Sequence, residues 1–325
     1  MEVAVLEKFV KQYGPLFDGF RNLMTSADRP LLAHYTTFQT LEAVLSKEEF
    51  WFSCPLFMND HEEMSFGMNL GRYVFNKLVG DQNFVEACGG KARADVYRNQ
   101  MNNLFDAVDQ SALDFFVLCF AEHDADNDDG LLSMWRGYGG NGAGAALIID
   151  PTCLPFNEAS PLIVAKVNYM ATNEREEWVV KTVRDAMEFA KDPSFDDEIL
   201  KQHAEKLFEV LLLAALLTKH RGFEEEREWR VIYLPYRNPG SPVKEHIGYT
   251  LVSEKVEPKL KLPIRPIEEG PETWKFDDLV KKIILGPTHN SAIAMNSACK
   301  MLTALKKDAW VSKLVASSIP YRNKR

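Results

Sequence analysis

The chain contains 325 residues, of which 46% are hydrophobic and 26% are charged. These proportions are those of an ordinary folded protein and exclude intrinsic disorder, a collagen-like repeat and a small disulfide scaffold. The formal net charge of −9 argues against a protein that wraps nucleic-acid phosphates, but the charge is unevenly distributed. Residues 300–325 hold seven basic side chains and one acidic, a net +6, which leaves −15 on the rest. This basic end either binds a polyanion or, as the simpler interpretation, is a solvated tail.

Hydrophobic periodicity predicts short strands separated by helical blocks. A helix is expected within residues 2–24, strands at 31–35 and 50–53, and a helix at 38–45 between them. Residues 62–112 are predicted to be helical with breaks at Gly80–Asp81 and Gly89–Gly90, and 115–120 to be a buried strand. Further strands are expected at 145–149, 164–169, 229–234 and 282–285, and further helices at about 174–190, 195–220 and 291–305.

This irregular order differs from the regular alternation of a doubly wound sheet. It predicts an α+β fold, with a compact, mostly antiparallel sheet core and helical insertions. We expect a single elaborated domain over 1–325, with its core at about 31–286. A helical N-terminal segment, 1–27, would precede the core, and a basic C-terminal helix and tail, 289–325, would follow it.

Several features predict a cytoplasmic protein with no membrane association. No apolar run of signal-peptide length follows Met1, and the longest apolar stretch, Val210–Leu217, is far shorter than the roughly 20 residues that a bilayer requires. The five cysteines are an odd number without a C-x-x-C pair, which is typical of reduced thiols and argues against a thiolate metal site.

Two motifs match known sites only in part. Gly137–Gly142 has the spacing G-x-G-x-x-G, but a helix is predicted before it and a strand after it, the reverse of a dinucleotide-binding turn. Asp124–Gly130 resembles the start of a calcium loop, but its glycine is one position late and the glutamate at position 12 is missing. We therefore predict neither a Rossmann site nor a metal site.

Three clusters at strand ends are better candidates. His34, followed by Tyr35 and Thr36, ends an apolar strand and could hydrogen-bond a ligand, although a structural histidine is the simpler reading of that segment alone. Trp51, Phe52 and Ser53 could offer a ring for stacking beside the polar pair Asn59 and Asp60, although core packing is the commoner role of such aromatics.

The third cluster is Phe223–Tyr233, in which four glutamates lead into an apolar strand. On a strand, Glu226, Glu228 and Arg230 would line one face, because side chains two positions apart share a face. Two carboxylates beside an arginine form an electrostatic site suited to a developing cation. An exposed charged edge is the alternative, but Trp229 and Val231 commit the neighbouring positions to the core.

The order H-Y-T, W-F-S, N-D-x-E, M-W-x-x-Y-x-x-x-G and E-x-E-W-R resembles an uncharacterised bacterial domain family over about Leu31–Gly286. In turn, H…(aromatic)-F-S…E-x-E resembles the signature of ADP-ribosyltransferases of the His-Tyr-Glu type. That resemblance implies a split antiparallel sheet that binds NAD as a substrate.

The resemblance also implies residue roles. His34 would hold a ribose hydroxyl, with Tyr35 and Thr36 beside it, and Glu228 would support the ribosyl cation, with Glu226 acting on the nucleophile. The remaining NAD-binding residues would be Trp51, Phe52, Ser53, Asn59 and Asp60. Trp51 replaces the expected tyrosine, so Phe52 or Tyr138 could stack on the nicotinamide instead.

The resulting hypothesis is an enzyme that transfers ADP-ribose from NAD to a protein or nucleic acid, RNA among the latter. Such an enzyme would serve as a bacterial toxin or antiphage effector, with an inhibitory antitoxin protein as a possible partner. The alternatives are an NAD glycohydrolase and a non-catalytic ligand-sensing module. For the enzyme, we expect Glu228→Gln to abolish nicotinamide release with little loss of folding.

Overall fold

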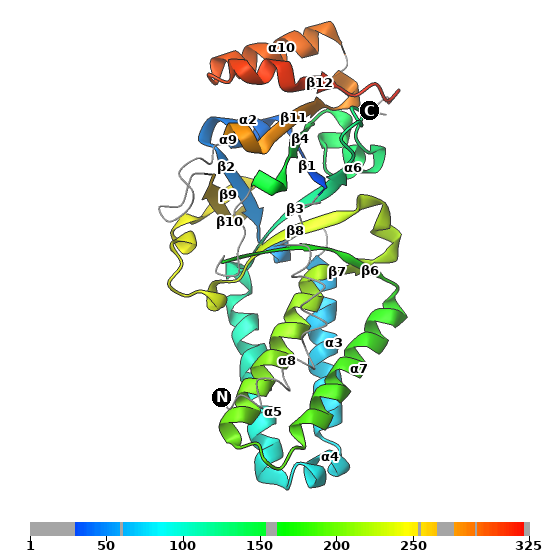
Figure 1. Cartoon of the computed structure of the whole chain (residues 1–325), viewed down its shortest axis with the longest axis vertical. Coiled ribbons are helices and arrows are strands. Elements are labelled where there is room, and N and C mark those ends of the chain that lie inside the picture. Colours follow the sequence, from blue (N-terminus) through cyan, green and yellow to red (C-terminus); the bar gives the residue numbers. More distant parts are fainter. Residues whose placement is uncertain are drawn as a thin grey trace. The chain divides into compact units, whose positions relative to one another are not determined.

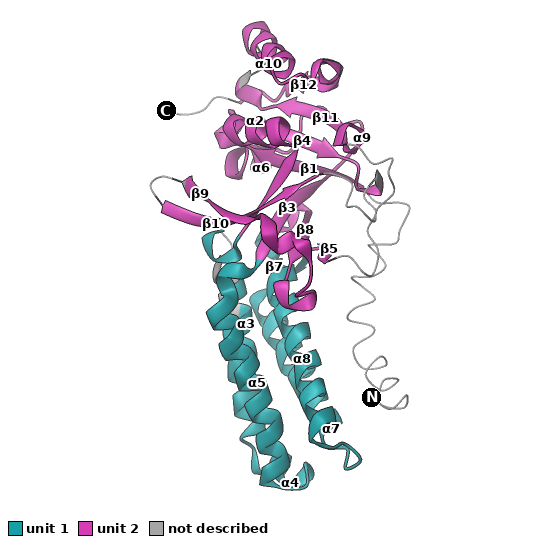
Figure 2. Cartoon of the chain, turned by 90° about the vertical axis from the view of Figure 1, so that its left-hand side faces the viewer, with its two compact units in different colours: residues 1–22, 54–115, 167–223 teal, residues 23–53, 116–166, 224–325 magenta. Residues whose placement is uncertain are grey.

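The computed structural model describes residues 30–58, 61–153, 161–252, 255–264, 276–289 and 291–321. The helix expected within residues 2–24, together with Asn59 and Asp60, lies outside the described residues. The described residues form two units, each built from segments distant in sequence (Figure 2). We call residues 54–115 and 167–223 the helical unit, and residues 30–53, 116–166 and 224–321 the sheet unit. The prediction of one elaborated domain stays a prediction.

Long helices make up most of the helical unit. Its elements are α3 (His61–Val79), α4 (Gln82–Ala87), α5 (Lys91–Ser111), α7 (Thr172–Ala190) and α8 (Asp197–Leu217), with a two-stranded parallel sheet of β6 (Asn168–Met170) and β7 (Thr218–His220). The α8 helix is the most buried, and α3, α5 and α7 pack around it (Figure 1). The carboxylates of Asp81 and Asp196 accept the backbone N–H groups of Asn83 and Ile199 in the first turns of α4 and α8, which fixes where these helices begin.

The sheet unit contains ten strands in its described part. They are β1 (Leu31–Thr36), β2 (Glu49–Ser53), β3 (Phe116–His123), β4 (Ala145–Ile149), β5 (Leu162–Lys166), β8 (Glu228–Tyr233), β9 (Ile247–Val252), β10 (Lys255–Pro263), β11 (Val280–Leu285) and β12 (Leu314–Ala316). The main order is β12-β11-β4-β1-β3-β2-β10-β9, and β8 lies between β3 and β5. All pairs are antiparallel except β11 with β12. The helices of this unit are α2 (Phe38–Lys47), α6 (Leu132–Gly137), α9 (Phe276–Leu279) and α10 (Ala292–Ala304).

The sheet forks along one edge of β3. The first half of β1 pairs with β3 from Leu31↔His123 to Ala33↔Ala121, whereas β2 meets the same edge only at Ser53↔Val117. The other edge of β3 pairs with β8 from Phe116↔Tyr233 to Ala121↔Glu228. Between these points, no described residue of β1 or β2 pairs in register with residues 118–120 of β3.

These observations confirm the predicted mixture of helices with a largely antiparallel sheet. A likeness to the ADP-ribosyltransferase fold stays a prediction. The strand expected at 164–169 proves to be two, β5 and β6, which belong to different units. Among the described residues, no helix has the length and apolarity needed to cross a bilayer.

The glycine-rich turn after α6 has a packing role. It leads into β4, as expected, and is followed by no helix. A Cβ on Gly144 would lie 2.1 Å from the carbonyl oxygen of Thr36, and one on Gly286 would lie 2.4 Å from that of Gly142. These glycines let the turn approach the ends of β1 and β11, which accounts for the pattern without a bound nucleotide.

Candidate functional site

The register divides the predicted residues between two faces of the sheet. Ala33 lies opposite Ala121, and Ala121 lies opposite Glu228, so these three side chains share a face. His34, the next residue of β1, must therefore project from the other face. We call the two sides the carboxylate face and the histidine face. The structure does not bring His34 and Glu228 together on one side.

Glu228 and Arg230 form a buried ion pair on the carboxylate face. Their side chains are 6% and 5% exposed, Arg230 Nε lies 2.8 Å from Glu228 Oε1, and Arg230 Nη2 lies 3.1 Å from Oε2. The two residues are adjacent on this face because β8 begins at Glu228, as the two-residue spacing predicts. Both oxygens of the candidate catalytic carboxylate thus have a guanidinium partner.

Glu226 reaches the same region by a different route. The prediction that it extends the strand is wrong, because residues 221–226 form a 3₁₀ helix and Arg227 has a left-handed φ of 44°. Its side chain is nevertheless buried, and Glu226 Oε1 accepts a hydrogen bond from the hydroxyl of Tyr138 at 3.2 Å. Tyr138 follows α6 directly as its C-cap. Sequence reasoning proposed Tyr138 only as a stacking ring and missed its contact with the acid.

Tyr35 also belongs to the carboxylate face, but it is part of the core. Its hydroxyl accepts the backbone N–H of Leu131 at 2.9 Å, and its ring packs edge-on against Trp135 at 4.8 Å. Burial is the main cause that raises the pKa of Tyr35 to about 12. The phenol is thus neutral and fixed in place, with no proton to exchange near neutral pH.

His34 lies at the fork of the sheet. Its Nδ1 lies 3.0 Å from the carbonyl oxygen of Cys119, which lies on β3 between the residues that pair with β1 and with β2. A carbonyl only accepts, so Nδ1 carries the proton. The ring contacts Phe50 and Phe120 edge-on, and burial lowers the pKa of His34, partly offset by the bond to Cys119. The neutral ring therefore has Nε2 as a hydrogen-bond acceptor.

The other predicted residues of β1 and β2 differ in how far their side chains are buried. Thr36, two positions after His34, and Phe52 are buried. Trp51 and Ser53 are partly exposed. Lys261 Nζ lies 4.8 Å from the Trp51 ring, Trp51 Nε1 donates to Glu49, and Lys259 Nζ donates to Ser53 Oγ at 2.8 Å. The Trp51 ring is therefore already contacted by a cation, which a stacking ligand would have to displace.

No group of three or more histidine, cysteine or acidic side chains in the described part of the chain is arranged to hold a metal ion. Two carboxylates of the 124–130 loop have cationic partners. Asp124 pairs with Arg227 at 3.2 Å, and Asp128 pairs with Lys282. Asn127 accepts the backbone N–H groups of Asp129 and Gly130 through its side-chain oxygen, which closes the loop as a turn.

Part of the basic C-terminal charge is used internally. Lys307 pairs with Glu48 and Asp277, and its ammonium lies 5.1 Å from the Trp310 ring. Lys313 donates to the carbonyl oxygens of Asp277 and Val280 at 2.8 and 2.6 Å. These two lysines hold residues of the sheet unit together, so neither interpretation of the segment as a solvated or polyanion-binding tail applies to them.

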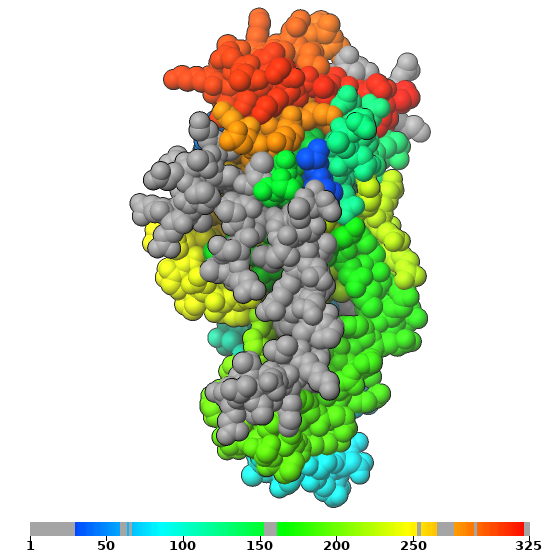
Figure 3. All heavy atoms as spheres, viewed as in Figure 1, coloured from blue at the N-terminus to red at the C-terminus, as the bar shows by residue number. Residues whose placement is uncertain are grey.

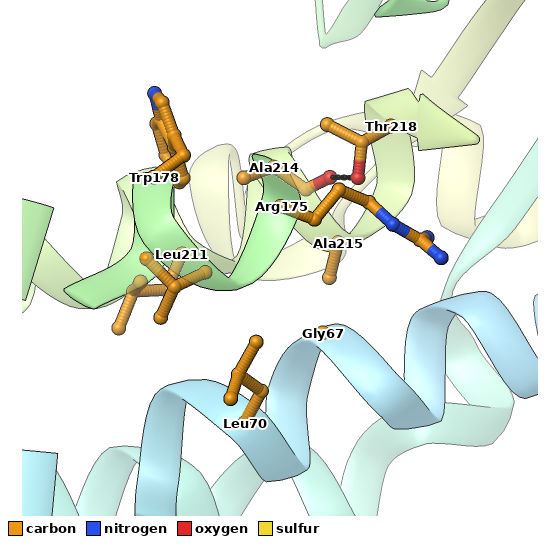
Figure 4. A pocket seen from close by; sticks show the side chains of 9 residues that line it. Gly67, Leu70, Arg175, Trp178, Leu211, Ala214, Ala215 and Thr218 are labelled. Atoms are coloured by element: carbon orange, nitrogen blue, oxygen red, sulfur yellow. Dashed lines mark hydrogen bonds between the residues drawn. The ribbon is translucent and has the colours of Figure 1, made fainter. Parts of the chain in front are cut away.

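A separate small pocket lies in the helical unit (Figure 4). It is lined by Gly67, Leu70, Arg175, Trp178, Val179, Leu211, Ala214, Ala215 and Thr218, none of which the sequence pointed to. Its volume of about 20 Å³ suffices for little more than one water molecule. It cannot hold a dinucleotide.

Comparison with known proteins gives one match. Residues 134–231 match the family described as "Protein of unknown function (DUF2971)". This stretch is a DUF2971 domain. It contains Tyr138, Glu226, Glu228 and Arg230, and hence the whole cluster on the carboxylate face. It is shorter than the span predicted for a bacterial domain family, and no curated protein or solved structure matches the chain. The resemblance to ADP-ribosyltransferases stays a prediction from the motifs.

Proposed function

We propose that this chain cleaves the nicotinamide–ribose bond of NAD and transfers ADP-ribose to a macromolecular acceptor, a protein or a nucleic acid. The observation that carries the proposal is the burial of two carboxylates within three residues, Glu226 just before β8 and Glu228 at its start. Acidic side chains are rarely withdrawn from water unless they are paired or functional. Both lie in the DUF2971 domain.

The chemistry suits these acids. When the C–N bond to ribose breaks, its electron pair leaves with neutral nicotinamide, and positive charge develops on the ribose, as in glycoside cleavage. Glu228 would stabilise that charge through fixed electrostatics. Glu226, oriented by Tyr138, would take the proton of the attacking nucleophile.

The proposal does not depend on a contact between His34 and NAD. The Nε2 acceptor of His34 suits a ribose hydroxyl, but it projects from the histidine face. The proposal therefore rests on the carboxylate face. It also includes the biological role, a toxin or antiphage effector with an antitoxin partner.

A second function is favoured by one specific observation. Because Arg230 binds both oxygens of Glu228, this carboxylate is already neutralised, as in a non-catalytic module whose ion pair only fixes the strand. An NAD glycohydrolase, with water as acceptor, would use the same cluster as the transferase.

The test is nicotinamide release from NAD by the purified chain, with labelled NAD to follow transfer into protein, RNA or DNA of a lysate. We expect Glu226→Gln and Glu228→Gln each to lower release at least a hundredfold. Contrary to the expectation from sequence, Glu228→Gln should also destabilise the fold, because Arg230 loses its charged partner. Rates are therefore compared well below each variant's Tm.

One control variant and three further outcomes sharpen this test. His34→Ala separates the faces, since an unchanged rate assigns the chemistry to the carboxylate face alone. Label only in free ADP-ribose indicates a glycohydrolase. Equal, measurable release by wild type and both glutamine variants contradicts the roles proposed for Glu226 and Glu228, and no release by wild type leaves the binding module.

A further inference from the structure

The last described residues of the chain fold back onto the segment that carries Tyr138. After β12 adds to the sheet beside β11, the backbone N–H of Ser317 donates to the carbonyl of Leu285 at 3.0 Å. The following residues then lie against α6 and its flanking turns (Figures 1 and 3). We call residues 314–321 the strap.

The strap has one anchor before α6. The carboxylate of Asp129 accepts the backbone N–H of Ser318 at 2.5 Å and its hydroxyl at 3.2 Å. The carbonyl of the same Asp129 accepts the indole N–H of Trp135 at 2.8 Å, which ties this point to the middle of α6. Asp129 therefore links the strap to α6.

A second anchor lies after α6. The hydroxyl of Tyr321 donates to Asn141 Oδ1 at 2.5 Å, and the guanidinium of Arg136 lies 5.6 Å from the Tyr321 ring. The ring packs directly over Gly142, since a Cβ there would lie 2.7 Å from its atoms. Gly142 has a φ of +84° and Asn141 one of +53°, so the turn takes its left-handed course where the ring covers it.

Tyr138 lies between these two anchors. Val315 and Ile319 of the strap pack against the core cluster that includes Trp135, and Tyr138 packs on the same cluster. The Tyr138 hydroxyl is 3.2 Å from Glu226, longer than the usual range of about 2.5–3.0 Å for a bond between two oxygens. A small displacement of α6 is thus enough to break it.

We infer that the strap positions Tyr138 against Glu226, and that Tyr321 is the main positioning residue. The inference rests on the proposed function for the role of Glu226, but the structural coupling stands apart from it. Tyr321 touches neither acid and acts only through the turn at residues 141–142 and α6. A chain without the strap contacts would keep its sheet but orient Glu226 less well.

The test compares Tyr321→Ala, Tyr321→Phe and Tyr138→Phe, with Lys300→Ala on the exposed side of α10 as the matched control. We expect Tyr321→Ala to speed amide exchange over residues 129–144 about tenfold. It should lower kcat for nicotinamide release about tenfold, with little change in KM for NAD. Tyr321→Phe keeps the ring over Gly142 and should fall between, while Lys300→Ala should match wild type.

The double variant Tyr321→Ala/Tyr138→Phe identifies the route. If the strap acts through Tyr138, the double variant is no slower than Tyr138→Phe alone. Full additivity of the two losses overturns the inference, as does unchanged amide exchange in Tyr321→Ala. If wild type releases no nicotinamide, the proposed function fails, and the exchange rates alone decide whether the strap orders the 129–144 segment.

Discussion

The helix bundle of the helical unit and strand β8 of the sheet unit bury polar side chains in different ways. In the bundle, Tyr97 and His203 form a hydrogen bond of 2.9 Å, and the His203 ring stacks on Phe189 at 4.7 Å. In β8, the buried polar groups are the ionised pair Glu228 and Arg230. A neutral pair costs little to bury, whereas two charges lose several kcal/mol of hydration each. The comparison indicates that β8 retains a costly charged pair where the His203 site of the bundle is built from neutral groups, and the functional proposal lies at that charged pair.

The largest expected effect comes from splitting the β8 pair. Arg230→Met leaves Glu228 buried without its partner and should lower the free energy of unfolding by about 3–5 kcal/mol. Urea denaturation measures the loss. The double variant Glu228→Met/Arg230→Met should recover most of it, because no uncompensated charge remains. A double variant as unstable as the single one would show that the pair is not an isolated electrostatic unit.

The buried histidine of the bundle predicts a pH effect. Burial lowers the pKa of His203 to about 3, against 6.5 in the unfolded chain. Between these values the unfolded state binds the extra proton, so stability is full above pH 6.5 and is lost as the pH falls. The slope is about 1.4 kcal/mol per pH unit, or about 3 kcal/mol at pH 4.5. Urea denaturation of wild type and His203→Gln over this range isolates the contribution, and parallel curves would contradict it.

The sequence predicts those elements whose position is decided by a local pattern. The breaks at Gly80–Asp81 and Gly89–Gly90 separate α3, α4 and α5 as expected, because local turn chemistry decides where helices end. Strands β1, β3, β4 and β8 were evident from apolar runs. The β9–β10 hairpin was missed, because the alternating Lys255, Glu257 and Lys259 beside Pro258 do not read as a strand by composition.

The candidate site shows a deeper limit. The separation of His34 from Glu228 depends on the registers of β1 with β3 and of β3 with β8, pairings between residues about 90 and 107 positions apart. A shift of one residue in either pairing would reverse it, and no local pattern reports that register. The contact of Tyr138 with Glu226 likewise joins residues 88 positions apart and depends on the left-handed Arg227.

Helix packing in the bundle supports a sharper test of smaller size. A Cβ on Gly67 of α3 would lie 2.8 Å from the Ala215 Cβ of α8 and 3.0 Å from its Cα. Gly67→Ala should therefore cost about 1–2 kcal/mol by overpacking, even after the gain in helix propensity. Gly71→Ala, one turn later, meets only the flexible end of Leu211 at 3.3 Å and should be neutral or stabilising. Thermal unfolding compares the two, and equal effects would contradict the close approach of α3 and α8.

The smallest effects concern surface ion pairs, one from each unit. Lys181 and Asp185 on α7 are 77% and 50% exposed, so Lys181→Ala should change the free energy of unfolding by less than about 0.5 kcal/mol. Lys166 of β5 instead pairs with Glu122, which is only 15% exposed and also accepts the indole N–H of Trp229. Lys166→Ala should cost more, about 1 kcal/mol, because the poorly hydrated Glu122 loses its nearer cation and keeps only Arg227 at 4.0 Å. Urea denaturation in low and in 0.5 M salt separates the two cases: salt removes the effect of Lys181→Ala and leaves most of that of Lys166→Ala. If both variants respond alike to salt, the Lys166–Glu122 pair stabilises the sheet unit no more than the Lys181–Asp185 pair stabilises the helical unit. The difference between the units would then be confined to the buried pair of β8.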